Sequence, residues 1–209
     1  MTTKEHKVFP PDFRVTLRGL VGVHQSIYPL IPPQGIYFEA LVEEAFRRIK
    51  KPFDIVKAGG RNQPRHDLLV ENTRISIKTE TGNNTKPNQI TITKLCTTER
   101  EPWEPKVLIG RVMEHLSRYD VVLMFRAVWT EKAIRYQLVE ISVEILRRIG
   151  DVTLEPVGRR EGRQSLGTDV LWHGEKVFRV HFDASDGKCS VRGLGLQHCE
   201  MLEEWDVRR

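Results

Sequence analysis

Residues 66–82, "HDLLVENTRISIKTETG", contain the pattern that decides the fold. Two apolar runs separated by polar residues are typical of a β-hairpin. A two-residue turn at Asn72-Thr73 would place Asp67 opposite Lys78. Because strand side chains alternate between faces, Ser76 and Glu80 would share the face of Lys78. The stretch predicts one apolar face toward a core and one face that gathers an acid, an amine and a second acid.

The segments around this hairpin predict an α/β fold. A helix is expected before it, where Phe38, Leu41, Val42, Ala45, Phe46 and Ile49 recur at helical spacing. Further strands are expected at residues 53–58, 89–95, 119–129 and 134–142, with helices at 104–118 and 143–150. This order of hairpins and a helical crossover indicates a mixed β-sheet flanked by helices.

The two ends of the chain differ from this central part. Residues 1–34 are rich in proline and predict an irregular N-terminal arm, partly ordered over residues 13–27. Residues 156–169, "PVGRREGRQSLGTD", predict a basic loop, and the Asp-Gly turn in "DASDGK" (183–188) predicts a C-terminal hairpin. We therefore expect a single domain over 1–209, with an arm at 1–34, a core at 35–149 and a β-rich extension at 150–209.

Composition narrows the class of protein. No apolar run approaches the roughly 18 residues of a membrane span, and no apolar signal segment follows the N-terminus. Cys96, Cys189 and Cys199 form an odd, scattered set, which indicates reduced thiols in a cytoplasm. The net charge of +5 and the isoelectric point of about 9.2 fit a polyanionic partner.

The polar face of the hairpin suits metal-assisted chemistry. Magnesium prefers oxygen ligands, usually one or two carboxylates with waters completing the shell. An ammonium group beside such an ion can orient an attacking water. It can also stabilise the negative charge that develops as a phosphodiester is attacked. An acid and an amine on one face, as Asp67 and Lys78 would be, thus provide the groups that metal-assisted attack on a phosphodiester requires.

Asp67, an eight-residue spacer and then Ser76-Ile77-Lys78 resemble the motif of the PD-(D/E)XK nuclease superfamily. The upstream helix, the three-strand meander, the next helix and the next strand also resemble that superfamily's core, over about residues 35–127. The family often carries a glutamate on its first helix, and Glu39 matches that place. The resemblance implies a restriction-endonuclease-like core with an added C-terminal β-hairpin region. It implies a type II restriction endonuclease that cuts a short specific sequence of double-stranded DNA.

Ser76 departs from the superfamily pattern, which usually has Glu or Asp two residues before the lysine. Two residues could replace the missing carboxylate as a metal ligand. Glu39 is preferred, because its helix should pack beside the sheet. Glu80 remains an alternative, because the alternation of side chains along the strand places it on the same face as Lys78. The resemblance thus implies catalytic roles for Asp67, Lys78, Glu39, Ser76 and Glu80, with metal ligands drawn from Asp67, Glu39 and Glu80.

Arginines outside the hairpin predict contacts to DNA. Arg61 and Arg65 precede Asp67 and could reach a phosphate or a guanine edge. The loop with Arg159, Arg160, Arg163 and Gln164 suits entry into a groove, because Arg and Gln match base edges. A double-strand break is most simply made by two sites related by two-fold symmetry, so we expect a homodimer.

Other interpretations compete with a restriction enzyme. Surface hairpins often pair an Asp with a Lys, so the spacing alone is a weak signal. Ser76 could mark a decayed site in a non-catalytic DNA-binding protein that keeps the nuclease fold. A structure-specific repair or recombination nuclease is a further alternative. The order of elements, Glu39 on the upstream helix and the basic charge together favour the restriction enzyme.

Overall fold

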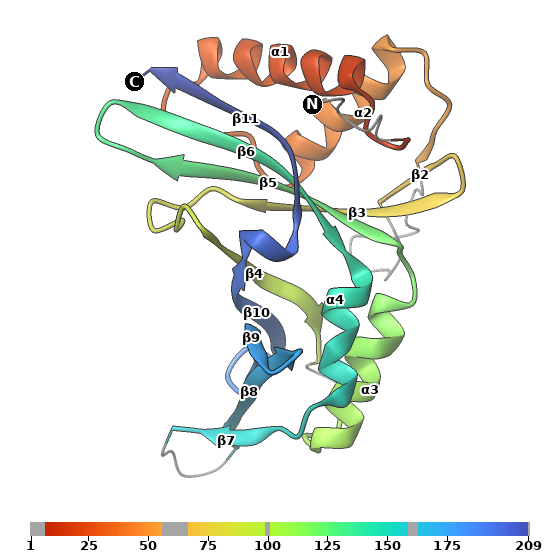
Figure 1. Ribbon diagram of the computed structural model, residues 1–209, viewed down its shortest axis with the longest axis vertical. Coiled ribbons are helices and arrows are strands. Elements are labelled where there is room, and N and C mark those ends of the chain that lie inside the picture. The colour runs from red at the N-terminus through yellow and green to blue at the C-terminus, as the bar shows by residue number, and fades with distance from the viewer. Residues whose placement is uncertain (1–6, 56–66, 99–100, 159–162, 209) are drawn as a thin grey trace. The chain divides into compact units, whose positions relative to one another are not determined.

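The computed structural model describes residues 7–55, 67–98, 101–158 and 163–208 (Figure 1). The chain forms two compact units. The first unit comprises residues 1–85, 119–140 and 201–209, and the second comprises residues 86–118 and 141–200. The single domain over 1–209 that the sequence indicates stays a prediction.

The first unit is built on a six-stranded sheet in the order β1-β2-β3-β5-β6-β11. The strands are β1 (Asp54–Ile55), β2 (Leu68–Val70), β3 (Thr73–Glu80), β5 (Val121–Trp129), β6 (Ala133–Ser142) and β11 (Glu200–Arg208). β1, β2 and β3 pair antiparallel, whereas β3 and β5 pair parallel. The sheet is therefore mixed, as the sequence predicts.

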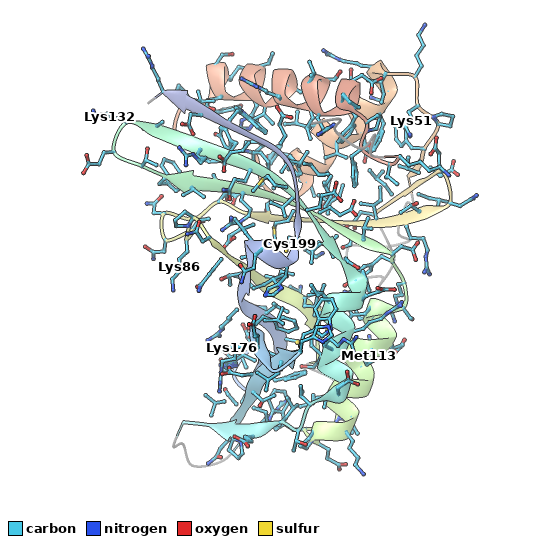
Figure 2. All side chains as sticks on the ribbon, viewed as in Figure 1. Lys51, Lys86, Met113, Lys132, Lys176 and Cys199 are labelled. Carbon is cyan, nitrogen blue, oxygen red and sulfur yellow. The ribbon has the colours of Figure 1, made fainter. Side chains whose placement is uncertain are left out.

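Two helices, α1 (Pro11–Ile27) and α2 (Ile36–Arg48), cover one face of this sheet (Figure 1). Their buried residues, Phe13 and Leu17 of α1 and Phe38 and Val42 of α2, belong to one core cluster with apolar side chains of the sheet. The side chains drawn in Figure 2 fill the space between these helices and the sheet, whereas Lys132 points outward from the turn between β5 and β6. Burial of this apolar surface stabilises the layer arrangement.

The N-terminal arm, predicted as irregular and only partly ordered over residues 13–27, contains a regular helix, α1, over residues 11–27. Pro11 occupies the first helical turn, where a missing N–H costs nothing. Phe13, Leu17, Leu20 and Val21 recur at helical spacing and are buried. Helix α1 is therefore part of the core of the first unit.

The hairpin has a different register from the predicted one. Its turn residues are Glu71 and Asn72, both with positive φ, as a type I′ turn requires. Leu68 consequently pairs with Ile75, so the expected pairing of Asp67 with Lys78 is wrong by two residues. A slip of two residues keeps every side chain on its predicted face, whereas a slip of one would reverse the faces.

The second unit is a five-stranded antiparallel sheet in the order β4-β10-β9-β8-β7. Its elements are β4 (Gln89–Thr97), α3 (Pro105–Leu116), α4 (Val143–Arg147), a 3-10 helix (Arg148–Asp151), β7 (Glu155–Val157), β8 (Ser165–Trp172), β9 (Glu175–Asp183), β10 (Lys188–Gly195) and a second 3-10 helix (Leu196–His198). The predicted C-terminal hairpin is confirmed as β9–β10. The predicted loop over 156–169 is shorter, because β7 and β8 include both of its ends.

The predicted fold class, a mixed α/β arrangement with helices flanking the sheet and an added C-terminal β-hairpin region, is confirmed. The arrangement agrees with a restriction-endonuclease-like core. Within the described residues, no helix is both long enough and apolar enough to cross a membrane.

Candidate active site

Asp67 lies directly before β2 and is held against β3 by main-chain and side-chain contacts. Its N–H donates to the carbonyl of Ile75 at 2.8 Å. Its Oδ2 accepts from the N–H of Ile77 at 2.5 Å and from Oγ of Ser76 at 3.3 Å. Hydrogen bonds to a carboxylate are stronger than neutral ones, so they fix the direction of this side chain. Within the described residues, Oδ1 of Asp67 accepts no hydrogen bond.

Ser76 is only 3% exposed. It occupies the place where the superfamily pattern usually has an acid, and its hydroxyl donates to Asp67. A buried hydroxyl needs such a partner, because burial without one costs free energy. Ser76 therefore orients the carboxylate of Asp67 and supplies no negative charge of its own.

Glu39 interacts electrostatically with Asp67 and with Lys78, although the three residues come from different elements. Glu39 lies in the first turn of α2, Lys78 lies on β3, and both side chains are partly buried. Burial raises the pKa of Glu39, and the negative charge of Asp67 raises it further. The ammonium of Lys78 has the opposite, smaller effect on the pKa of Glu39. The three charges thus act on one another within a single cluster.

The start of α2 is tied to β3, which explains why Glu39 reaches the hairpin. The N–H of Gly35 donates to Oγ1 of Thr79 at 3.4 Å, and Oγ1 of Thr81 donates to Oε1 of Gln34 at 3.0 Å. Phe38, next to Glu39, stacks on Phe125 of β5 with ring centroids 4.4 Å apart. These contacts fix the first turn of α2 over the part of the sheet that carries Lys78.

Glu80 is bound elsewhere. Its Oε2 accepts from Nε of Arg126 at 2.7 Å, and Arg126 is fully buried. Arg126 also donates to Oε1 of Gln137, whose Nε2 donates to Oε2 of Glu204 at 2.7 Å. Glu80 is therefore the counter-ion of a buried arginine at the end of β3.

Sequence reasoning missed Arg126, although the signal is present. It is the only charged residue in the apolar run 121–129, "VVLMFRAVW". A charge is seldom fully buried unless it is paired, so a charged residue in a buried strand predicts a partner on a neighbouring strand. The parallel register of β3 and β5 sets Arg126 beside Glu80.

The donors present fit a magnesium ion better than a softer metal. Asp67 and Glu39 offer carboxylate oxygens, the ligand type that Mg²⁺ prefers. Within the described residues, the side chain of Glu39 makes no hydrogen bond, so its oxygens and Oδ1 of Asp67 are available. A cation between two carboxylates that repel each other would lower their mutual repulsion. No group of three or more His, Cys, Asp or Glu in the described part of the chain is arranged to hold a metal, so waters would complete the shell.

Of the predicted DNA-contacting residues, Arg163 and Gln164 are described, whereas Arg61, Arg65, Arg159 and Arg160 lie outside the described residues. In the second unit, the guanidinium of Arg163 lies 3.7 Å from the ring centroid of Trp103. Nε1 of Trp103 donates to the carbonyl of Gln164 at 2.7 Å. Trp103 therefore holds this end of the β7–β8 loop, a role that the sequence did not indicate.

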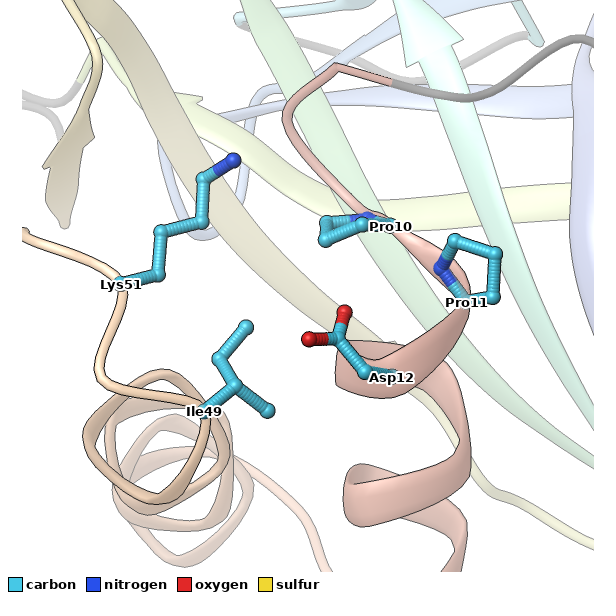
Figure 3. Close-up of a pocket in the computed structure, with 5 residues that line it drawn as sticks. All are labelled: Pro10, Pro11, Asp12, Ile49 and Lys51. Atoms are coloured by element: carbon cyan, nitrogen blue, oxygen red, sulfur yellow. The ribbon is translucent and has the colours of Figure 1, made fainter.

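A pocket of the first unit lies away from the acidic cluster (Figure 3). It is lined by Pro10, Pro11, Asp12, Ile49 and Lys51. Ile49 follows the C-terminal end of α2, whereas Glu39 lies in its first turn. Lys51 donates to the carbonyl of Lys7 at 2.7 Å and pairs with Glu71 at 3.2 Å. The ammonium of Lys51, one of the two charged groups of the pocket, thus has structural partners.

Comparisons with known proteins relate the chain to a family of nucleases. The sequence model of the SmaI family, described as type II site-specific deoxyribonuclease, matches residues 34–207. The chain is 26% identical to the type II restriction enzyme SmaI of Serratia marcescens over 174 residues, which cover 80% of this chain and 70% of that protein. No solved structure matches the chain significantly. The matched region includes Glu39, Asp67, Ser76 and Lys78.

Proposed function

The chain belongs to the SmaI family of type II site-specific deoxyribonucleases, and we propose that it cuts one short sequence of double-stranded DNA with Mg²⁺ as its cofactor. As an endodeoxyribonuclease it hydrolyses internal phosphodiester bonds. The observation that carries the proposal is the convergence of Asp67, Glu39 and Lys78 at the β2–β3 hairpin.

In the proposed site, Asp67 and Glu39 would hold Mg²⁺ through their carboxylate oxygens. Mg²⁺ supplies charge neutralisation at the phosphate and makes a nearby water more acidic. Ser76 and the N–H of Ile77 keep the carboxylate of Asp67 aligned by their hydrogen bonds to Oδ2. This preorganisation matters, because a misplaced ligand weakens stabilisation of the transition state.

Lys78 acts on the reacting atoms in this proposal. Within the described residues its ammonium makes no hydrogen bond or ion pair, and it interacts electrostatically with Glu39. It is therefore available to orient the attacking water. It also stabilises the negative charge that grows on the phosphate oxygens as the water attacks. Glu80 has no part in metal binding, because its partner is the buried Arg126.

The proposed assembly is a homodimer on double-stranded DNA, with one active site for each strand. The net charge of +5 favours binding to a polyanion. Six residues are proposed to contact the DNA. Arg163 and Gln164 are described in the structure, whereas Arg61, Arg65, Arg159 and Arg160 lie outside the described residues. The proposed compartment is the cytoplasm, which agrees with the free thiols of Cys96, Cys189 and Cys199.

The test is to incubate the protein with a large plasmid and Mg²⁺ and to sequence the ends of the fragments. We expect discrete fragments whose ends share one short sequence, and no cleavage with EDTA. The Asp67→Ala variant, purified in the same way, controls for contaminating nucleases. Cleavage at nicks or branches without a shared sequence would instead indicate a structure-specific repair nuclease.

A further inference from the structure

The segment between residues 23 and 37 exposes an unusual number of large apolar side chains. Val23, Ile27, Tyr28, Leu30, Ile31, Ile36 and Tyr37 are each between 50% and 71% exposed. They run from the end of α1 through the connection to the start of α2 (Figure 1). We call residues 23–37 the apolar segment. Large apolar side chains gathered on one part of a surface commonly mark an interaction site.

The apolar segment is also uncharged. Residues 19–38 contain no Asp, Glu, Lys or Arg, in a chain in which 29% of the residues are charged. Burial lowers the pKa of His24, which keeps its imidazole neutral at neutral pH. A surface that contacts the DNA backbone needs cations for the phosphates. The apolar segment has none, so its chemistry suits contact with protein.

We propose that the apolar segment is the surface through which two copies of this chain associate, an inference that rests on the proposed function. Two proteins that each carry a net charge of +5 repel each other, and this repulsion is smallest where the contact surfaces carry no charge. In a two-fold dimer the same patch meets itself, so one uncharged segment supplies both sides of the interface.

The position of the apolar segment links this interface to catalysis. Its last residue, Tyr37, comes two positions before Glu39 on α2. Gly35, near its end, is hydrogen-bonded to Thr79 of β3, the strand that carries Lys78, and Gln34 is hydrogen-bonded to Thr81, which directly follows that strand. An interface built on this segment holds the helix and the strand of each active site in a fixed relation to the two-fold axis.

The experiment measures the mass of the full-length protein in solution, without DNA, by light scattering and sedimentation. We expect the wild type at twice the 24.2 kDa chain mass. The double variant Ile27→Glu/Ile31→Glu should run at one chain mass. Both side chains are largely exposed, so the change should leave the fold intact, which circular dichroism checks. Leu171→Glu is the matched control, because Leu171 is 56% exposed on β8 and lies outside the segment.

A second double variant tests whether loss of the dimer could result from misfolding caused by the added charges. Ile27→Ser/Ile31→Ser adds no charge and should raise the dimer dissociation constant at least about tenfold, since each buried aliphatic side chain contributes strongly to association. On a supercoiled plasmid with Mg²⁺, the glutamate double variant should nick single strands and linearise little DNA. Loss of the dimer by Leu171→Glu but not by Ile27→Glu/Ile31→Glu would overturn the proposal, as would a monomeric wild type.

The outcomes separate this inference from the proposed function. If Ile27→Glu/Ile31→Glu is monomeric while wild-type protein with Mg²⁺ cuts no DNA, the interface stands and the proposed function fails. If the wild type is a dimer that cuts DNA and the double variant remains a dimer, the proposed function stands and the interface is elsewhere.

Discussion

Arg126 of β5 and Glu80 of β3 form a buried ion pair, with Nε of Arg126 2.7 Å from Oε2 of Glu80. The parallel register places the two residues side by side. Glu80 shares its strand with Lys78 and, by sequence alone, is the second candidate for the missing metal ligand after Glu39. Because a buried guanidinium needs its counter-ion, the pair removes Glu80 from that role. Glu39, which interacts electrostatically with Asp67, remains the carboxylate that we propose as the second metal ligand.

The first prediction separates the two glutamates. Glu39→Gln should reduce the cleavage rate by at least about 10²-fold, because it removes a metal ligand and keeps the size of the side chain. Glu80→Gln should stay within about tenfold of wild type, since its effect on the chemistry is indirect. Single-turnover cleavage of a short duplex at several Mg²⁺ concentrations measures both. An inactive Glu80→Gln beside an active Glu39→Gln would show that β3 supplies the ligand.

The second prediction concerns the stability of the buried pair. Arg126→Met should lower the free energy of unfolding by about 3–5 kcal/mol, because it leaves the carboxylate of Glu80 without its partner. The double variant Arg126→Met/Glu80→Leu should recover much of this loss, since no unpaired charge remains. Arg135→Met is the matched control. Arg135 pairs with Asp206 at 2.9 Å on the same sheet, but both side chains are exposed.

For that exposed pair we expect a loss of at most about 1 kcal/mol. Urea unfolding of the three variants measures the differences. Equal losses for Arg126→Met and Arg135→Met would contradict a special role for the buried pair.

The third prediction concerns Asp67 and Lys78. Asp67→Ala and Lys78→Ala should each reduce cleavage by at least about 10³-fold while duplex binding and the fold are largely kept. The double variant should be little worse than either single one, because both groups act on one water and one phosphate. Cleavage rates are compared with duplex affinity measured in Ca²⁺. Near-wild-type cleavage by either single variant would remove it from the active site.

The sequence predicts which side chains of the hairpin share a face more reliably than it predicts their pairing across the two strands. Alternation along β3 places Ser76, Lys78 and Glu80 on one face whatever the turn, so that part of the prediction survives the shift of register by two residues. The turn itself was misassigned, because the left-handed conformations of Glu71 and Asn72 depend on the twist of the whole hairpin. The alternation of residues along a strand thus determines which side chains share a face. The pairing of the two strands depends on the conformation of the turn and on the surrounding fold.

Helix α1 shows a second limit. Gly19 and Gly22 each disfavour a helix interior by about 1 kcal/mol relative to Ala, and prolines lie on both sides of the segment. Local propensity therefore favoured an irregular arm. The burial of Phe13 and Leu17 against the rest of the core outweighs that propensity. Arg126 was missed for a related reason, since its partner Glu80 lies on a strand 46 residues away in sequence.

The fourth prediction follows from the raised pKa of Glu39, which burial and the charge of Asp67 produce. A carboxyl group with a higher pKa in the folded state binds more protons there than in the unfolded chain. The free energy of unfolding therefore falls as pH rises from the ordinary value of 4.5 through the raised one. Glu39→Gln removes this decrease, so in the absence of metal the variant should gain stability relative to wild type between pH 4 and pH 7.

Urea unfolding at pH 4 and at pH 7, in EDTA, gives the difference between the variant and the wild type. Glu131→Gln, in the exposed turn between β5 and β6, serves as the control for loss of a carboxylate. The prediction is wrong if the free energy of unfolding of Glu39→Gln, minus that of wild type, falls from pH 4 to pH 7.

The last prediction concerns the stacking of Arg163 on Trp103 in the second unit. Arg163→Ala should weaken duplex binding about tenfold and reduce the salt dependence by about one counterion, as expected for one lost phosphate contact. Trp103→Ala should weaken binding to a similar extent, because the ring preorganises the guanidinium and donates to the carbonyl of Gln164. Trp103→Phe should be intermediate, since it keeps a ring but loses the donor.

Trp172→Ala is the matched control, because Trp172 also carries an arginine, Arg148, 5.6 Å from its ring. Affinities are measured in Ca²⁺ at several salt concentrations, and cleavage rates at saturating duplex and Mg²⁺. If Arg163 positions DNA, the variants lose affinity but keep their rate at saturation, because the metal ligands are untouched. An equal loss of affinity in Trp172→Ala would mean that the loss does not depend on the contact between Arg163 and Trp103.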